Sequence, residues 1–540
     1  MNIAQDRQPL LLAFALSFFL IALNLYFRPI FPLDETRYIS VAWEMWQSNN
    51  WLVPHINGET YAHKPPMMFW LMNIIWGIFG VSEWVARIIV PLLACLNLIL
   101  IRRLSLLVYN HSAQAADYSP LILLSFTGWF LYVPMSMFDL LLTVFVLCCV
   151  ICIWRFAQTG RWSFTFWAGV SLGTGMLVKG PVILIYIIPV FLLYFMWRRE
   201  NMISAGKLLK AGIITLIVGV IMVLSWAIPA AIAGGEEYAQ AIFWGQSAGR
   251  MKDSFAHARP FYWYAMILPI LLLPWVFLKG MWRTTTWLNL SKSDRFLLAW
   301  FFLVVFIFSC ISGKQIHYLF PVFPALAIFL GAKVDIKKFG KDPFLAILLL
   351  LLAVLIFSGN LWVAKAFPTA HAPQVAIFWG IIPLFLSALM LLPERLGKHY
   401  FKLVLISFPL GIYILIPALS SVFTQLYDVS ETATFIHQKQ EEGVVVAHLG
   451  KYHNQFQFSG RLEHPLAIVD QEQPERNTWL KAHPEALVIL ARKIADDLLV
   501  KKSIYIHPFR GRLHIIIQAK YLTQWYNQRA ELRKNNHLEQ

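Results

Sequence analysis

Apolar runs long enough to cross a lipid bilayer recur through the first 423 residues of the chain. A span needs about 20 mostly apolar residues, and inside hydrocarbon a single span satisfies its backbone hydrogen bonds only as a helix. Hydrophobic residues make up 58% of the chain and charged residues 14%, whereas a soluble fold carries about 25% charged residues. We therefore predict an all-α polytopic membrane protein with about 13 transmembrane helices. The runs are 10–27, 84–101, 120–135, 138–154, 162–178, 181–197, 208–232, 261–278, 296–312, 316–332, 344–364, 375–392 and 403–423.

Basic residues account for the net charge of +16, and their distribution indicates how the spans are oriented. Short cytoplasmic loops collect Lys and Arg, and with thirteen spans every second loop is basic. This alternation places the N-terminus inside and the C-terminus outside. The positive charge orients helices, so we expect no nucleic-acid partner. The basic loops are 102–103, 155–161, 198–210, 279–295, 333–341 and 395–402.

A fourteenth apolar segment, 66–80, is short and begins beside two prolines. If it crossed the membrane, the basic loops that follow would face outward, so we interpret it as a helix at the outer interface. The loop 28–65 before it mixes apolar and polar residues at helical spacing, which predicts an amphipathic interfacial helix there. We assign residues 1–423 to a transmembrane domain that includes interfacial helices within 28–80.

The composition changes after residue 424, where five short β-like runs alternate with polar, helix-compatible stretches. This alternation predicts a small soluble α/β domain over 424–540, outside the membrane. The five cysteines all lie inside apolar runs, so we expect no disulfide framework. The first apolar run lacks a small-residue cleavage site, and we interpret it as a retained anchor. The β-like runs are 444–447, 466–469, 486–490, 504–506 and 513–517.

Two aspartates on the outer face are candidate catalytic residues. Asp34 follows the first span, and Asp139 lies at an outer turn between Phe138 and Leu140. A carboxylate at membrane depth costs about 2.5–3.5 kcal/mol near a helix centre and less at its edge. Each could instead cap the helix that follows it. Both lie on one face near the lipid headgroups, which favours a functional role.

A few cations share this otherwise weakly basic face, among them Arg37, Lys64, Lys179 and Arg259. Lys64 immediately precedes a Pro-Pro pair that restricts the backbone. Long basic side chains can also extend to lipid headgroups without binding a substrate. Cations clustered with carboxylates at headgroup level fit a site for a lipid phosphate, whose oxygens Arg and Lys neutralise.

The order of several motifs resembles one enzyme family. DETRY at 34–38 follows the first span, and HKPP follows at 63–66. MFDL at 137–140, LVKGP at 177–181, HARPFYWY at 257–264 and SGKQIHYLFPVFP at 312–324 come next in order. Together they resemble the lipid-linked-sugar glycosyltransferases of the GT-C fold, and most of all the bacterial aminoarabinose transferases of lipid A, relatives of the protein O-mannosyltransferases. The likeness covers about residues 8–330, and the C-terminal residues match only in architecture.

The resemblance implies a periplasmic reaction at the cell inner membrane, among membrane lipids. An undecaprenyl-phosphate-linked sugar, expected to be 4-amino-4-deoxy-L-arabinose, passes to a lipid A phosphate and contributes to polymyxin resistance. Asp34 and Asp139 would then be the acidic pair of the active site. The phosphates would be held by Arg37, Lys64, Lys179 and Arg259, while Tyr318 would line the polyprenyl site.

One departure from the family affects a metal site. Relatives commonly have Glu before the lysine of the Lys-Pro motif, where this chain has His63, and the arginine after His257 is displaced by one residue. A carboxylate ligand is therefore missing. His63 and His257 could still bind zinc as a pair with Asp or water, or form local hydrogen bonds only.

The residues leave two other functions open. The acceptor could be a protein hydroxyl or a lipopolysaccharide core sugar, in which case Asp34 would act as a general base. A lipid transporter or flippase is a different class of protein. It is disfavoured because paired spans broken by Gly or Pro, typical of inverted-repeat transporters, are absent from the sequence.

Overall fold

The computed structural model describes residues 6–110, 112–244, 258–278, 281–282, 287–336, 343–366, 372–391, 398–493 and 497–538. By their internal contacts the residues form two compact units, which we describe separately. The membrane unit comprises Met1–Phe27 and Ala62–Leu419, and the second unit comprises Arg28–Tyr61 and Ser420–Gln540. The predicted boundary at residue 423 lies close to this division. The loop 28–61, however, groups with the C-terminal residues rather than with the spans.

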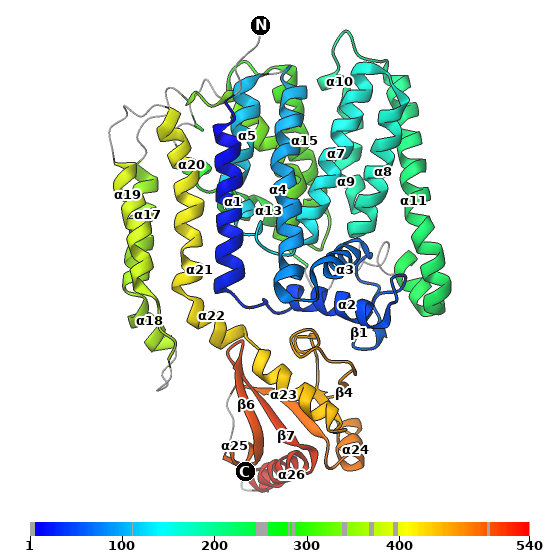
Figure 1. The fold of residues 1–540 in the computed structure, drawn as a ribbon, viewed down its shortest axis with the longest axis vertical. Coiled ribbons are helices and arrows are strands. Elements are labelled where there is room, and N and C mark those ends of the chain that lie inside the picture. Colours follow the sequence, from blue (N-terminus) through cyan, green and yellow to red (C-terminus); the bar gives the residue numbers. More distant parts are fainter. Residues whose placement is uncertain are drawn as a thin grey trace. The chain divides into compact units, whose positions relative to one another are not determined.

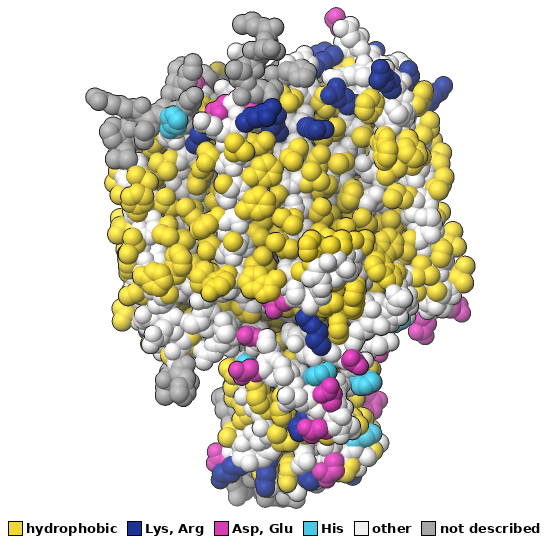
Figure 2. All heavy atoms as spheres, viewed as in Figure 1, with side chains coloured by type: hydrophobic (Ala, Val, Ile, Leu, Met, Phe, Trp, Pro, Cys, Tyr) yellow, Lys and Arg dark blue, Asp and Glu magenta, His cyan; other side chains and the backbone are white. Residues whose placement is uncertain are grey.

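The membrane unit is a bundle of helices, most of which run side by side (Figure 1). Hydrophobic side chains cover the face of this bundle shown in Figure 2, as lipid contact requires. The helices are α1 (Gln8–Phe27), α3 (Met67–Phe79), α4 (Glu83–Val108), α5 (Ala113–Ser125), α6 (Thr127–Phe130), α7 (Phe138–Thr159), α8 (Trp162–Lys179), α9 (Ile183–Leu192), α10 (Tyr194–Trp197), α11 (Ala205–Gln240), α13 (Trp263–Leu271), α15 (Lys292–Cys310), η5 (Ile316–Val322), α16 (Phe323–Lys333), α17 (Pro343–Phe357), α18 (Gly359–Ala366), α19 (Ile381–Met390), α20 (Lys398–Tyr413) and α21 (Leu415–Ala418).

Within the described residues, fewer helices reach spanning length than the thirteen predicted. Eight are long and apolar enough to cross a membrane, or nine if α17 and α18, bent by 56°, form one span. The run 162–178 and most of the run 181–197 lie in one helical stretch, Trp162–Leu192, which is interrupted at Gly180 (φ 74°, ψ −160°). Prolines shorten other runs, as in the nine-residue α13 with Pro269 inside it, because Pro removes a helical hydrogen bond. The chain is a multi-pass membrane protein.

The described residues of the basic loops, which were predicted to share one side of the membrane, lie at one end of the bundle. Arg199 donates from Nη2 to the carbonyl oxygen of Val108 at 2.6 Å, and Ser293 donates to the same oxygen at 2.7 Å. Lys402 pairs with Asp6 at 3.2 Å near the start of the chain. Lys and Arg side chains gather at this end of the bundle (Figure 2). Segment 66–80 forms α3 at the opposite end (Figure 1).

The second unit contains the predicted α/β domain. Its five-stranded sheet has the order β4-β3-β5-β7-β6, with β4 and β5 parallel to β3 and the other pairs antiparallel. All five predicted strands are present, and among the polar, helix-compatible stretches are those that form α23 and α24. The elements are α22 (Ser420–Tyr427), α23 (Ser430–Glu441), β3 (Val446–Leu449), β4 (Ala467–Val469), α24 (Glu475–Ala482), β5 (Leu487–Arg492), α25 (Asp497–Lys502), β6 (Ser503–Phe509), β7 (Arg512–Gln518) and α26 (Ala519–Leu538).

The loop 28–61 folds onto this sheet domain. It forms α2 (Asp34–Ser48), the predicted amphipathic helix, and a two-stranded ribbon of β1 (His55–Ile56) and β2 (Glu59–Thr60). Ser40 donates a hydrogen bond to the carbonyl oxygen of Asn454 at 2.8 Å, and the Trp43 indole donates to that of Leu462 at 3.1 Å. The side chain of Asn57 makes three more hydrogen bonds to segment 457–466. These bonds fix α2, and therefore Asp34, relative to the sheet.

Candidate functional site

Asp139 and Lys179 form a buried ion pair in the membrane unit. The Lys179 Nζ lies 2.5 Å from Asp139 Oδ1, and the two side chains are 8% and 2% exposed. Asp139 is in the first turn of α7, and Lys179 is the last residue of α8. Each charge therefore has the sign that its helix end favours. Asp139 does not cap α7, because Met137 occupies the N-cap position, without a side-chain hydrogen bond.

His317 and Tyr318 complete this cluster from η5. The Nε2 of His317 lies 3.6 Å from Asp139 Oδ2, so both carboxylate oxygens of Asp139 face a potential cation. The Lys179 ammonium lies 4.3 Å from the centroid of the Tyr318 ring, a cation–π distance. The Tyr186 hydroxyl donates a hydrogen bond to the carbonyl oxygen of Tyr318 at 2.7 Å. Sequence reasoning found Tyr318 but missed His317, although His317 lies in the same motif; a His beside a predicted site residue was the available signal.

Lys64 lies beside the start of α7. Its ammonium is 5.6 Å from the ring centroid of Phe138, the residue before Asp139. Phe138 also packs edge-on against Phe69 of α3, with ring centroids 5.8 Å apart. Lys64, Asp139, Lys179 and Tyr318 are thus four of the predicted residues that the membrane unit brings to one region.

Asp34 and Arg37 form the other predicted group, in the second unit. Asp34 is the first residue of α2, and its carboxylate pairs with the Arg37 guanidinium. It also accepts a hydrogen bond from the Tyr38 hydroxyl at 3.2 Å. Burial, and after it the Asp34 charge, raises the pKa of Tyr38 well above its usual value, so this hydroxyl keeps its proton. The Nε of Arg37 is buried, and among the described residues it has no acceptor, which leaves a donor for a ligand.

The turn that presents Asp34 is held by a second buried ion pair. Arg28 donates to both carboxylate oxygens of Glu35, at 2.6 and 3.0 Å, and the backbone N–H of Phe31 donates to Glu35 at 3.1 Å. Leu33, immediately before Asp34, has φ 82° and ψ −72°, a strained γ-turn conformation. The Arg28–Glu35 pair closes the turn around this strained residue. Glu35 was not a predicted site residue, although it lies in the DETRY motif.

The remaining predicted residues are Arg259, His63 and His257. Arg259 is exposed, and its backbone is held by Ser312 and by the Lys314 ammonium. His63 is exposed, and His257 lies outside the described residues. In the part of the chain that the structure describes, no three His, Cys, Asp or Glu side chains are grouped to hold a metal ion. The zinc site stays a prediction, and we assign no chemical step to a metal.

Known proteins share parts of this sequence. A family model described as dolichyl-phosphate-mannose-protein mannosyltransferase matches residues 63–226. An undecaprenyl phosphate-alpha-4-amino-4-deoxy-L-arabinose arabinosyl transferase 2 of Proteus mirabilis is 28% identical over 337 residues, 60% of this chain and 59% of that protein. A transferase of the same description, from Aeromonas hydrophila, is 28% identical over 64% of this chain and 65% of its own length. The chain thus spans less than two thirds of these relatives.

Solved structures extend the likeness to nearly the whole fold. The crystal structure of ArnT from Cupriavidus metallidurans in the apo state has a TM-score of 0.74 at 18% identity, and covers 95% of this chain and 98% of that one. The same protein bound to undecaprenyl phosphate has a TM-score of 0.70 and covers 94% and 97%. At this identity the match shows the fold. The chain therefore has the GT-C fold of the lipid-linked-sugar glycosyltransferases, and among them it is similar to the aminoarabinose transferases.

Proposed function

We propose that the protein is a glycosyltransferase of the bacterial inner membrane that moves a sugar from undecaprenyl phosphate to a phosphate of lipid A. The sugar proposed is 4-amino-4-deoxy-L-arabinose, and the reaction takes place at the periplasmic face. The observation that carries the proposal is the buried Asp139–Lys179 pair at 2.5 Å, flanked by His317 and Tyr318 in a GT-C fold. The aminoarabinose transferases similar to this chain support the choice of donor.

The proposed acceptor needs no strong base, because a lipid A phosphate is already an anion. One of its oxygens attacks the anomeric carbon, and the bond from that carbon to the undecaprenyl phosphate oxygen breaks with inversion. The electron pair of the broken bond stays on the leaving phosphate. The chief task of the protein is to stabilise that developing charge with preorganised cations.

The described residues offer cations of two kinds for this task. Lys179 is already paired with Asp139. Its ammonium is therefore held in place with its charge balanced, and it does not serve as a free phosphate ligand. The Lys64 ammonium lies 5.6 Å from the ring centroid of Phe138, next to Asp139, and Arg37 retains a buried Nε donor. We assign Lys64 and Arg37 to the phosphates and Asp34 to the amino group of the sugar, whose positive charge its carboxylate can pair with.

Lipid A from cells that express the protein tests this function. The gene is placed in a polymyxin-sensitive strain without its own transferase, and lipid A is analysed by mass spectrometry. We expect an aminopentose increment with the wild-type chain and its loss from Asp34→Asn, Asp139→Asn and Lys64→Ala. Exposed residues of the basic loops provide matched controls, Glu200→Gln for the carboxylates and Lys210→Ala for the lysine.

Membrane levels of every variant are compared by immunoblotting, so that loss of protein is separated from loss of activity. Wild-type modification by all three site variants would contradict the site assignment. Unmodified lipid A together with a newly glycosylated protein would indicate that the acceptor is a protein hydroxyl rather than lipid A. The match of residues 63–226 to a protein mannosyltransferase model makes this the second candidate.

A further inference from the structure

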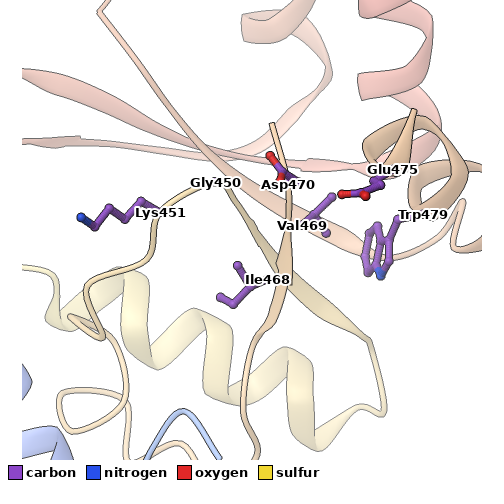
Figure 3. A pocket seen from close by; sticks show the side chains of 7 residues that line it. All are labelled: Gly450, Lys451, Ile468, Val469, Asp470, Glu475 and Trp479. Carbon is purple, nitrogen blue, oxygen red and sulfur yellow. The ribbon is translucent and has the colours of Figure 1, made fainter. Parts of the chain in front are cut away.

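The second unit carries a cleft that the proposed reaction does not use. It measures about 530 Å³ and is lined by Gly450, Lys451, Ile468, Val469, Asp470, Glu475 and Trp479 (Figure 3). The cleft lies at the carboxyl ends of the parallel strands β3 and β4. The connection between β4 and β5 contributes α24, which also lines the cleft.

One wall of the cleft is an aromatic face beside a carboxylate. Glu475 and Trp479 are four residues apart on α24 and therefore share a face, and Figure 3 shows them side by side. The ring of Trp479 stacks on that of His483, with centroids 4.5 Å apart and an angle of 21°, which restricts its orientation. Ile468, on the edge strand β4, is 51% exposed and lies between Trp479 and Lys451 (Figure 3).

The opposite end of the cleft is shaped by the turn after β3. Gly450 has φ 78°, where a side chain is strained. A Cβ at this position would also lie 2.3 Å from the Nε2 of Gln471. The backbone N–H of Gly450 donates to the carbonyl oxygen of Val469 at 2.7 Å, which ties the ends of β3 and β4 together. The cleft therefore has a preformed floor.

The charged side chains that line the cleft indicate which class of ligand it can bind. Asp470 and Glu475 outnumber Lys451, which gives a formal charge of −1. Among the described residues, none of the three has an ion-pair partner within 4.0 Å, and Asp470 accepts one hydrogen bond, from the N–H of Glu472 at 3.0 Å. This balance disfavours a phosphate. It favours hydroxyl groups, which donate to carboxylates, or an amine.

We propose that this cleft is a saccharide-binding site for an uncharged or amine-bearing sugar unit. The apolar face of a sugar ring would pack on Trp479, an amphipathic surface suited to such contacts. Its hydroxyl or amino groups would donate to Asp470 and Glu475. The volume lies within the range of small-molecule sites, about 300–1,000 Å³. The site belongs to the second unit alone, so the proposal does not depend on the transferase reaction.

Binding is measured on the full-length protein in phosphatidylcholine nanodiscs, because detergents with sugar headgroups would compete. Saturation-transfer NMR with cellobiose, the glucosamine disaccharide and glucose 1-phosphate as probes gives each Kd. We expect both disaccharides to bind, and glucose 1-phosphate at least fivefold more weakly than either. Trp479→Ala should weaken disaccharide binding at least tenfold, and Trp479→Phe should restore part of it.

Two controls separate the cleft from the rest of the unit. Trp51→Ala removes a tryptophan that is 37% exposed elsewhere in the second unit, and it should leave binding unchanged. The double variant Asp470→Asn/Glu475→Gln should reduce the preference for the glucosamine disaccharide over cellobiose at least threefold. Its unfolding temperature should stay unchanged. Absence of disaccharide binding would overturn the proposal, as would tighter binding of glucose 1-phosphate or wild-type binding by Trp479→Ala.

Discussion

The buried pair of Asp139 and Lys179 gives the sharpest test of the proposed site. At 2.5 Å and an effective dielectric constant of about 20, the gross attraction is about 7 kcal/mol. Desolvation of two ions costs several kcal/mol each, so the net contribution of the pair to stability is near zero. Removal of one partner, in contrast, leaves an uncompensated buried charge and costs about 3–5 kcal/mol.

A double-mutant cycle separates these terms. Asp139→Asn and Lys179→Met should each lower the free energy of unfolding by about 3–5 kcal/mol, whereas the double variant should lose less than either alone. The coupling energy is then at least about 3 kcal/mol, at the upper end of the range for residues in contact. Unfolding is followed by circular dichroism in mixed micelles with increasing SDS.

An exposed pair at nearly the same distance provides the control. Lys439 and Glu442 lie 2.6 Å apart with side chains 28% and 54% exposed, and such pairs couple by at most about 1 kcal/mol. The double variant of Asp139 and Lys179 should fold but fail to modify lipid A, because its chemistry is gone while its charge balance is kept. Additivity within about 0.5 kcal/mol would refute the pairing, and an active double variant would refute the catalytic assignment.

Three further predictions concern the second unit. Glu35→Gln weakens the bidentate contact with Arg28 and leaves the Arg28 charge buried, so it should lower the free energy of unfolding by about 3 kcal/mol. In membranes at 20 °C this variant should have a lower kcat and a smaller change in KM. An unchanged kcat would contradict the role of Glu35 in positioning the strained turn. Asn57→Gly is compatible with the left-handed backbone at this position (φ 52°) but removes three side-chain hydrogen bonds, each worth about 1 kcal/mol. We expect faster amide hydrogen exchange over residues 457–466 in this variant. Unaltered exchange would refute the stabilising role of Asn57. Burial lowers the pKa of His448 to about 4 and of His514 to about 3, so the unfolded chain, with a His pKa of about 6.5, binds more protons as the pH falls. Stability is full above about pH 6.5, and by pH 5 it should fall by about 2 kcal/mol per histidine; an unfolding temperature of the second unit that does not change between pH 7 and 5 would contradict this.

Patterns along the chain were sufficient for much of the fold. The basic loops identified which ends of the spans lie together, because charged loops stay on one side of a bilayer whatever the packing between helices. Alternating short runs located all five strands of the sheet, since each strand is a local apolar segment. The helix count was the weaker part, because breaks such as those at Gly180 and within α17–α18 occur inside runs that remain apolar throughout.

The sequence by itself determined which charged residues are candidates for the site and which motifs they belong to. Only the tertiary structure decided their partners. Asp139 meets Lys179 across 40 residues of chain, and His317 joins them from η5, because α7, α8 and η5 end in the same region of the bundle. In the same way α2, which looked like part of the membrane domain, packs on the C-terminal sheet through Trp43 and Asn57. Contacts at such separations depend on how helices and sheets pack, and no local pattern encodes them.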